Sequence, residues 1–238
     1  MADLPSRLLR GLMVLTCAFC GIEALRPQAA TAQVPPSAAE VAGYSGLHAD
    51  SANGAVNAIR QMIANGFDPD VRDGNGRTPF HVAAFLKQRG AIEALAAGRA
   101  DVNALDNQRY DAVTIAAVAD DPETMSAAIR AGNRASNITS IYDGTALIAA
   151  AHLGHDEVVR RLIAAGAPLD HVNNLGWTAL IEAVILGDGG KRHEACVAAL
   201  LAAGANPKLA DRNGLTPLEL ARRRGYAGMV RMIEAAGG

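Results

Sequence analysis

The chain has 238 residues, of which 50% are hydrophobic and only 4% aromatic, and its formal charge at pH 7 is −2. A chain of this length can bury a substantial core, which here must be built from Ala, Leu, Val and Ile. The small net charge provides no overall field that would attract DNA or RNA, so a nucleic-acid partner is not expected.

The first 32 residues have the pattern of a secretory signal peptide. Arg7 and Arg10 precede an apolar run at 11–22, and the small residues of "AATAQ" follow it. The run is shorter than the roughly 20 residues of a membrane-spanning helix. We therefore predict cleavage after Ala32, export to a bacterial periplasm and no stable membrane insertion afterwards. The alternative is an uncleaved N-terminus that anchors the chain to the inner membrane.

The cysteines fit the same interpretation. Cys17 and Cys20 form a C-x-x-C inside the segment that is predicted to be removed, where thiols act as small hydrophobic groups. Cleavage would leave Cys196 as the single thiol. The mature chain could then form no internal disulfide, and its stability must come from packing.

After a predicted linker at 33–42, one phrase recurs along the chain. It reads "TPFHVAA" at 78–84 and "TPLELAR" at 216–222, and its six copies start 33, 33, 34, 33 and 38 residues apart. The starting residues are Ser45, Thr78, Asp111, Thr145, Thr178 and Thr216. A period near 33 with Thr-Pro-Leu-His and two alanines is typical of ankyrin repeats. Over residues 43–238 the chain resembles the ankyrin family.

The resemblance implies an all-α solenoid of about six helix-turn-helix units joined by short hairpin loops, and local signals agree with it. Thr145 can cap a first helix, and Pro79 and Pro217 occupy the first helical position of theirs. Gly154 and Gly166 end the two helices of the fourth unit. The apolar face of its second helix is given by Val158, Val159, Leu162 and Ile163.

Such units must stack, because one helix pair cannot bury its own apolar stripe. The terminal units differ from the middle ones as end caps should. Asp50 and Ser51 replace the alanine pair in the first unit, and residues 222–224 make the first helix of the last unit strongly basic.

No motif in the sequence indicates catalysis, a cofactor or a metal. His48 and His81 occupy the histidine position of the repeat, where ankyrin repeats use it for internal hydrogen bonds. His152 and His155 form H-x-x-H without a third ligand nearby. The stretch "GDGGKR" at 187–192 lacks the spacing of a phosphate-binding loop. We expect no enzyme.

The fifth unit is five residues longer than the usual period, and the extra residues fall at 187–193, in the turn between its helices. A surface loop extension has little thermodynamic cost. The insertion can therefore be a tolerated loop or an additional side contact.

By resemblance, ankyrin arrays bind proteins on a concave face made by hairpin tips and first helices. The corresponding tip residues are Arg77, Gln108, Tyr110, Tyr142, Leu175 and Trp177. The corresponding first-helix residues are Phe85, Leu86, Leu153, Ile185 and Leu186. Because aromatic residues are common interface anchors, we expect the groove to centre on Tyr110, Tyr142 and Trp177. Each apolar residue could instead pack against its neighbouring hairpin.

These features predict a noncatalytic, monomeric interaction module of the periplasm that binds a protein partner. The alternative is an assembly, protection or immunity factor for an envelope or secreted enzyme. A third class, a hydrolase with unrecognised polar residues, would turn over ester or peptide substrates at sub-stoichiometric amounts.

Overall fold

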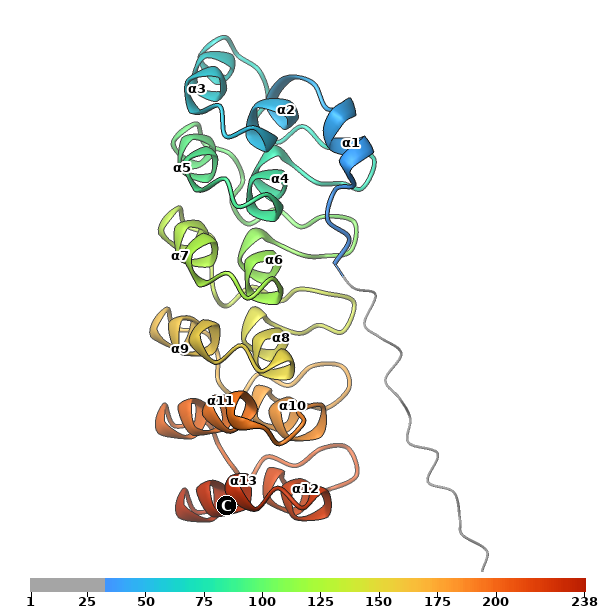
Figure 1. Ribbon diagram of the computed structural model, residues 1–238, viewed down its shortest axis with the longest axis vertical. Coiled ribbons are helices and arrows are strands. Elements are labelled where there is room, and N and C mark those ends of the chain that lie inside the picture. Colours follow the sequence, from blue (N-terminus) through green and yellow to red (C-terminus); the bar gives the residue numbers. More distant parts are fainter. Residues whose placement is uncertain (1–32) are drawn as a thin grey trace, which may run out of the picture. The chain divides into compact units, whose positions relative to one another are not determined.

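The computed structural model describes residues 33–238, which form one compact unit of 13 helices without a strand in this part of the chain. After the short α1 (Ala38–Gly43), twelve helices form six pairs that stack in one direction (Figure 1). The predicted all-α stack of six helix-turn-helix units is confirmed. The first helices of the pairs are α2 (Gly46–Ala52), α4 (Pro79–Phe85), α6 (Ala112–Val118), α8 (Ala146–Leu153), α10 (Ala179–Ile185) and α12 (Pro217–Arg224).

The second helices form a column of their own beside the first (Figure 1). They are α3 (Val56–Ala64), α5 (Arg89–Ala97), α7 (Pro122–Arg130), α9 (Asp156–Ala164), α11 (Lys191–Ala202) and α13 (Ala227–Ala235). We call the first helices inner and the second helices outer, because the hairpin loops extend from the side of the first column. The units are numbered one to six in chain order.

Side-chain caps fix where the inner helices begin. The Thr145 hydroxyl accepts a hydrogen bond from the amide of Ile148, and the Asp111 carboxylate accepts one from the amide of Thr114. Gly154 then ends α8 with φ 70°, a left-handed conformation that favours glycine. The predicted start and stop signals of the fourth unit are therefore those that the structure uses.

The core runs through the stack as a single cluster rather than as separate centres. Adjacent alanines are buried in the inner helices α4, α6 and α8, as at Ala116 and Ala117, which lets neighbouring helices approach closely. Leu162 in α9 is 0% exposed, as expected of a second-helix core residue. Stability must therefore depend on contacts between neighbouring units.

Hydrogen bonds also join the hairpin tips, by which we mean the turn residues two to five positions before each inner-helix cap. An amide of one tip donates to a carbonyl of the preceding tip at each of three junctions. These bonds are Asn107 to Asn75 (3.1 Å), Ser140 to Arg109 (2.8 Å) and Asn174 to Tyr142 (2.9 Å). The tips of units two to five thus form a continuous edge of backbone.

The segment 33–42, expected to be a linker, contains most of α1 in the structure. Ser37 caps this helix and forms a reciprocal capping box with Glu40. The Ser-x-x-Glu spacing that specifies such a box is visible in the sequence. The ordered domain therefore begins several residues before the expected boundary.

The insertion at 187–193 is anchored to the array. The His193 ring lies 2.9 Å from both the Asp188 carboxylate and the carbonyl of His152. Arg192 donates to Asp120 (2.7 Å) and Asp156 (3.3 Å), which belong to the third and fourth units. Of the two alternatives, the structure shows a side contact within the chain itself, which links three units along their inter-helix turns.

Candidate protein-binding groove

The tips of the hairpins divide into two chemical kinds. Three residues before each inner-helix cap, the tip carries an amide in the second, third and sixth units and an apolar or aromatic residue in the fourth and fifth. These residues are Asn75, Gln108, Asn213, Tyr142 and Leu175. The repeated backbone therefore presents a polar edge at units two and three, followed by an apolar edge at units four and five.

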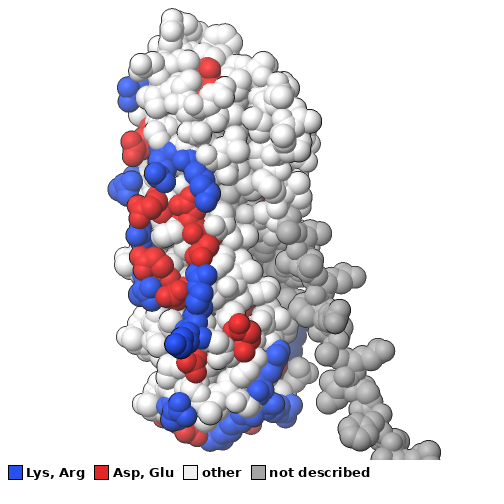
Figure 2. Space-filling model, in the orientation of Figure 1, with Lys and Arg blue, Asp and Glu red and all other residues white. Residues whose placement is uncertain are grey.

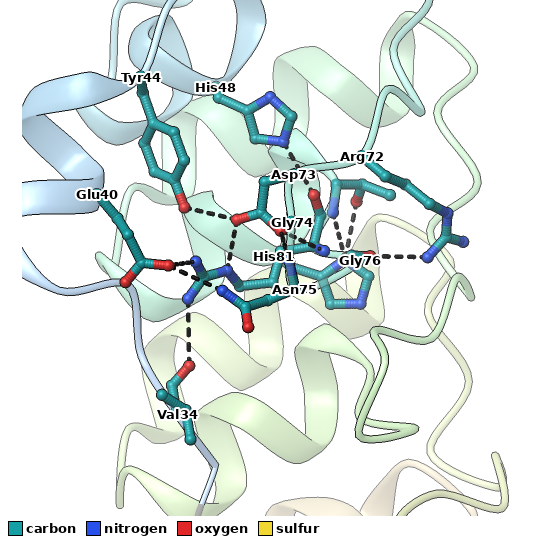
Figure 3. A network of polar contacts seen from close by, with 12 residues as sticks. Val34, Glu40, Tyr44, His48, Arg72, Asp73, Gly74, Asn75, Gly76 and His81 are labelled. Carbon is teal, nitrogen blue, oxygen red and sulfur yellow. Dashed lines mark hydrogen bonds and ion pairs between the residues drawn. The ribbon is translucent and has the colours of Figure 1, made fainter.

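A polar network at the second tip centres on Arg77, and Figure 3 shows the surrounding Val34, Glu40, Asp73 and Asn75. The Arg77 guanidinium donates to Asp73 at 2.6 Å and to Glu40 of α1, and the residue is only 1% exposed. Asn75 adds a 2.8 Å hydrogen bond to the same Glu40. Arg77 thus holds α1 against the second hairpin, and its expected place on the exposed surface is wrong.

The carboxylates of this network are held in their charged forms. Burial raises the pKa of Asp73, but hydrogen bonds from Arg77 and Tyr44 outweigh it and leave the pKa below its usual value. Hydrogen bonds from Ser37 lower the pKa of Glu40, and the bond from Arg77 adds to the effect. The network is therefore ionic at neutral pH.

Residues 33–36, which we call the arm, lie across the second and third tips. Arg77 donates through Nη1 to the carbonyl of Val34, and the Val34 amide donates to Oε1 of Gln108, each at 3.3 Å. Two of the predicted partner-binding residues therefore contact the chain's own backbone. The three residues border a cleft of about 70 Å³ together with Asn75, Asp106 and Asn107.

Tyr110 is not at the surface. It is 7% exposed and belongs to the core cluster, and burial raises the pKa of its phenol. Its backbone carbonyl accepts a 3.0 Å hydrogen bond from His81 of the preceding unit. Arg77, at the equivalent position of the second hairpin, is buried as well, so the expected exposed aromatic centre at Tyr110 is wrong.

Four of the seven exposed large hydrophobic residues within 33–238 lie in the fourth and fifth units. Leu153 at the end of α8 is 41% exposed, while Tyr142, Leu175 and Trp177 are half-buried. Ile185 and Leu186 at the end of α10 are half-buried as well, as are Phe85 and Leu86 in the second unit. These side chains pack partly against the array and leave part of their surface free, so they stay predicted contact residues.

Three exposed hydrophobic residues of these units were not predicted. Ile138 and Ile141 lie in the fourth hairpin and are 48% and 52% exposed, and Val172 in the fifth hairpin is 49% exposed. The two hairpins are neighbours, because Asn174 donates to the carbonyl of Ile141 at 2.9 Å. Branched apolar residues in hairpins otherwise rich in polar residues were the available signal.

One carboxylate lies among these apolar residues. Glu182 in α10 is 4% exposed and occupies a position where the other inner helices of units two to six have Val82, Ile115, Ala149 and Leu220. Asn173 donates to it at 2.8 Å, and His152 lies 3.4 Å away. Asn173 replaces the aspartate of other hairpins and so avoids placing two carboxylates side by side.

Two further histidines contact backbone carbonyls of neighbouring units. His48 contacts the carbonyl of Arg77 at 2.9 Å, and His155 contacts that of Ala117 at 2.9 Å. Within residues 33–238, no group of three His, Cys, Asp or Glu side chains is arranged to hold a metal. In the same residues, no helix has the length and apolar character needed to cross a membrane.

Charge is unevenly distributed over the face shown in Figure 2. Basic and acidic side chains form a band over the outer helices and inter-helix turns, and basic residues also gather at the last unit. The part of this face beside the band is largely free of charge. Arg161 of α9 pairs with Glu123 of α7 and with Glu157 of its own helix, each at 2.9 Å, so the first of these ion pairs links two outer helices.

Comparisons with known proteins agree with this architecture. The family model for ankyrin repeats in three copies matches residues 47–132 and 113–211. The ankyrin repeat protein YahD of Escherichia coli (strain K12) is 34% identical over 185 residues, which cover 77% of this chain and 92% of that protein.

Solved structures give the same result. An ankyrin repeat domain of Acinetobacter baumannii has 42% identity and a TM-score of 0.75, covering 80% of this chain and 97% of that one. A chain in the complex of a predatory endopeptidase with an immunity protein, from Bdellovibrio bacteriovorus, has 21% identity and a TM-score of 0.66, covering 81% and 98%; it shares the fold. By sequence and by structure, this chain belongs to the ankyrin-repeat family.

Proposed function

We propose that the protein is a noncatalytic binding module that holds a partner protein on the fourth and fifth units of its groove. The observation that carries this proposal is the exposed apolar surface of Ile138, Ile141, Leu153 and Val172. Exposed apolar surface concentrated in one region is uncommon in a protein without a partner. The half-buried Tyr142 and Trp177 supply the aromatic area that interfaces use as anchors.

The proposed contact residues follow from exposure. They are the predicted Tyr142, Leu153, Leu175, Trp177, Ile185 and Leu186, together with Ile138, Ile141 and Val172. The predicted Phe85 and Leu86 lie in the second unit and are at most a peripheral part of this surface. Arg77 and Gln108 contact the arm, so they can contact the partner only after the arm has been displaced.

We further propose that the protein acts in a bacterial periplasm after cleavage at Ala32. The pattern in residues 1–32 supports export, and these residues lie outside the described part of the structure. A specific alternative is an assembly, protection or immunity factor for an envelope or secreted enzyme. One solved structure of this fold is a complex between an endopeptidase and an immunity protein, which supports testing secreted enzymes as partners.

The test is capture of the partner by tagged protein purified from its native cells. Replacement of Tyr142, Leu175 and Trp177 by alanine should reduce the captured partner at least about tenfold, as loss of interface anchors does. The matched control replaces Phe67 and Val71, which are exposed apolar residues of the second hairpin, and should capture as the wild type does. Equal loss in both variants, or undiminished capture by the first, would reject this assignment.

A further inference from the structure

Pro36 of the arm is buried, but Val34, the residue that contacts the surface of the cleft, is held only at its backbone and only weakly. Both hydrogen bonds of Val34 are 3.3 Å long, at the long end of the range for protein hydrogen bonds. The Val34 side chain is 54% exposed, so it adds little packing. The side-chain amide nitrogen of Gln33 is buried without a hydrogen-bond partner, which is an unfavourable arrangement. The first part of the arm, Gln33 and Val34, therefore fits its position poorly, whereas Pro36 is packed.

The surface under the arm is built independently of it. Arg77 keeps its place through Asp73 and Glu40 (Figure 3), and the amide of Gln108 donates to Asp106 at 2.9 Å. The anchor that follows the arm is also separate, because Ser37 and Glu40 form their own capping box. Residues 33–35 can thus leave while α1 and the second tip remain in position.

What this surface recognises is an extended backbone. Arg77 donates a hydrogen bond to the backbone carbonyl of one residue, and Gln108 accepts one from the backbone amide of the same residue. Because both bonds are to the backbone, the pair can bind one residue of any extended segment, whatever its side chain. We propose that this clamp of Arg77 and Gln108 is a second binding site, for an extended segment of the partner protein, and that the arm occupies it until such a segment replaces it.

The clamp lies where a segment of the bound partner could reach it. This second site therefore rests on the proposed function. The tips of units two to five are joined in sequence by backbone hydrogen bonds, so the clamp is continuous with the apolar tips of Tyr142 and Leu175. A partner seated on units four and five could extend a strand along the same edge. The apolar tips of units four and five would then bury apolar surface against the partner, and the clamp would fix the register of the strand.

The probe for this test is a fluorescent peptide with the sequence of residues 33–37, QVPPS, acetylated at its N-terminus. Val34→Pro removes the amide that the arm donates to Gln108 and so releases the arm of the full chain. We expect the peptide to bind this variant roughly three- to tenfold more tightly than the wild type, the change that one net hydrogen bond gives. Adding Gln108→Ala removes the same hydrogen bond from the bound peptide and should weaken its binding by a similar factor, whereas Asn213→Ala, at the equivalent tip of the sixth unit, should leave the affinity unchanged.

Equal affinity of the peptide for the wild type and for Val34→Pro would overturn the proposal, as would unaltered binding after Gln108→Ala. Hydrogen exchange on the unmodified protein provides a measurement that needs no variant. The Val34 amide should exchange at least about tenfold faster than the Arg77 amide, which donates to Asp73 at 2.9 Å; equal protection would also overturn it. Neither result depends on Trp177, so this proposal and the proposed function can fail separately.

Discussion

At the scale of single residues, the direction of a side chain decides whether a predicted contact residue is available. Arg77 and Tyr110 stand immediately before an inner-helix cap and are buried, whereas Gln108 and Tyr142 stand two positions earlier in their hairpins and are half-exposed. Residue type alone does not show this difference, because arginine and tyrosine are common both at interfaces and in buried polar networks.

The burial of Arg77 predicts a large cost for removing its charge. Arg77→Met leaves Asp73 buried without its cation, and we expect a loss on the order of 3 kcal/mol in the free energy of unfolding. The control is Arg109→Met. Arg109 pairs with Asp143 at 3.0 Å with both side chains 48% exposed, so its loss should be below about 1 kcal/mol. Urea denaturation measures both, and similar losses would contradict the structure of this network.

At the scale of elements, the repeat was predictable in detail and the irregular parts were not. Thr145, Gly154 and Leu162 act as their positions in the motif require, because capping and burial are local and recur in each unit. The helix α1 was missed although Ser37 and Glu40 carry its capping signal. A six-residue helix is too short to show apolar periodicity, and it is held by contacts with Arg77, which is distant in sequence.

The attachment of α1 predicts a response to acid. The folded-state pKa of Glu40 is lowered, so its contribution to stability is complete above its unfolded value, about 4.3. That contribution is lost as the pH falls through the folded value. The Glu40→Gln variant lacks the contribution of the ionised carboxylate at all pH values. Its melting temperature should therefore fall less between pH 5 and pH 3 than that of the wild type. A steeper fall in the variant would contradict the assignment.

The outer helices predict a conventional core effect. Leu162 is 0% exposed in α9, and Leu162→Ala should destabilise the chain by about 2–5 kcal/mol. Leu153→Ala removes the same side-chain atoms from a residue that is 41% exposed, so it should cost well under half as much. A thermal melt that shifts equally for the two variants would argue against the stacked-helix packing.

At the scale of the whole molecule, the residues that join the units are separate from the residues proposed to bind a partner. Ion pairs join the outer helices, and Arg192 links three units through Asp120 and Asp156. The exposed apolar residues lie in the hairpins and at the ends of inner helices instead. The sequence period was sufficient to predict the array, but the exposed Ile138 and Ile141 were missed because the fourth hairpin departs from the regular spacing.

The number of cysteines that react with maleimide in the unfolded protein shows whether the chain has been cleaved after Ala32. Cys196 is 0% exposed, and burial raises the pKa of its thiol to about 12, so the folded protein should leave it unlabelled by maleimide. After unfolding, a chain cleaved at Ala32 should label at one cysteine, whereas a chain that keeps Cys17 and Cys20 should label at three. Three labelled cysteines in protein from periplasmic extracts would contradict cleavage.

Site-specific photocrosslinking in living cells tests the central claim most directly. A photoreactive amino acid at Leu175, in the hairpin of the fifth unit, should give one discrete adduct with a partner protein. The same group at Phe67, exposed on the second hairpin, should give little or none. Strong adducts at Phe67 with none at Leu175 would contradict a partner held by the fourth and fifth units.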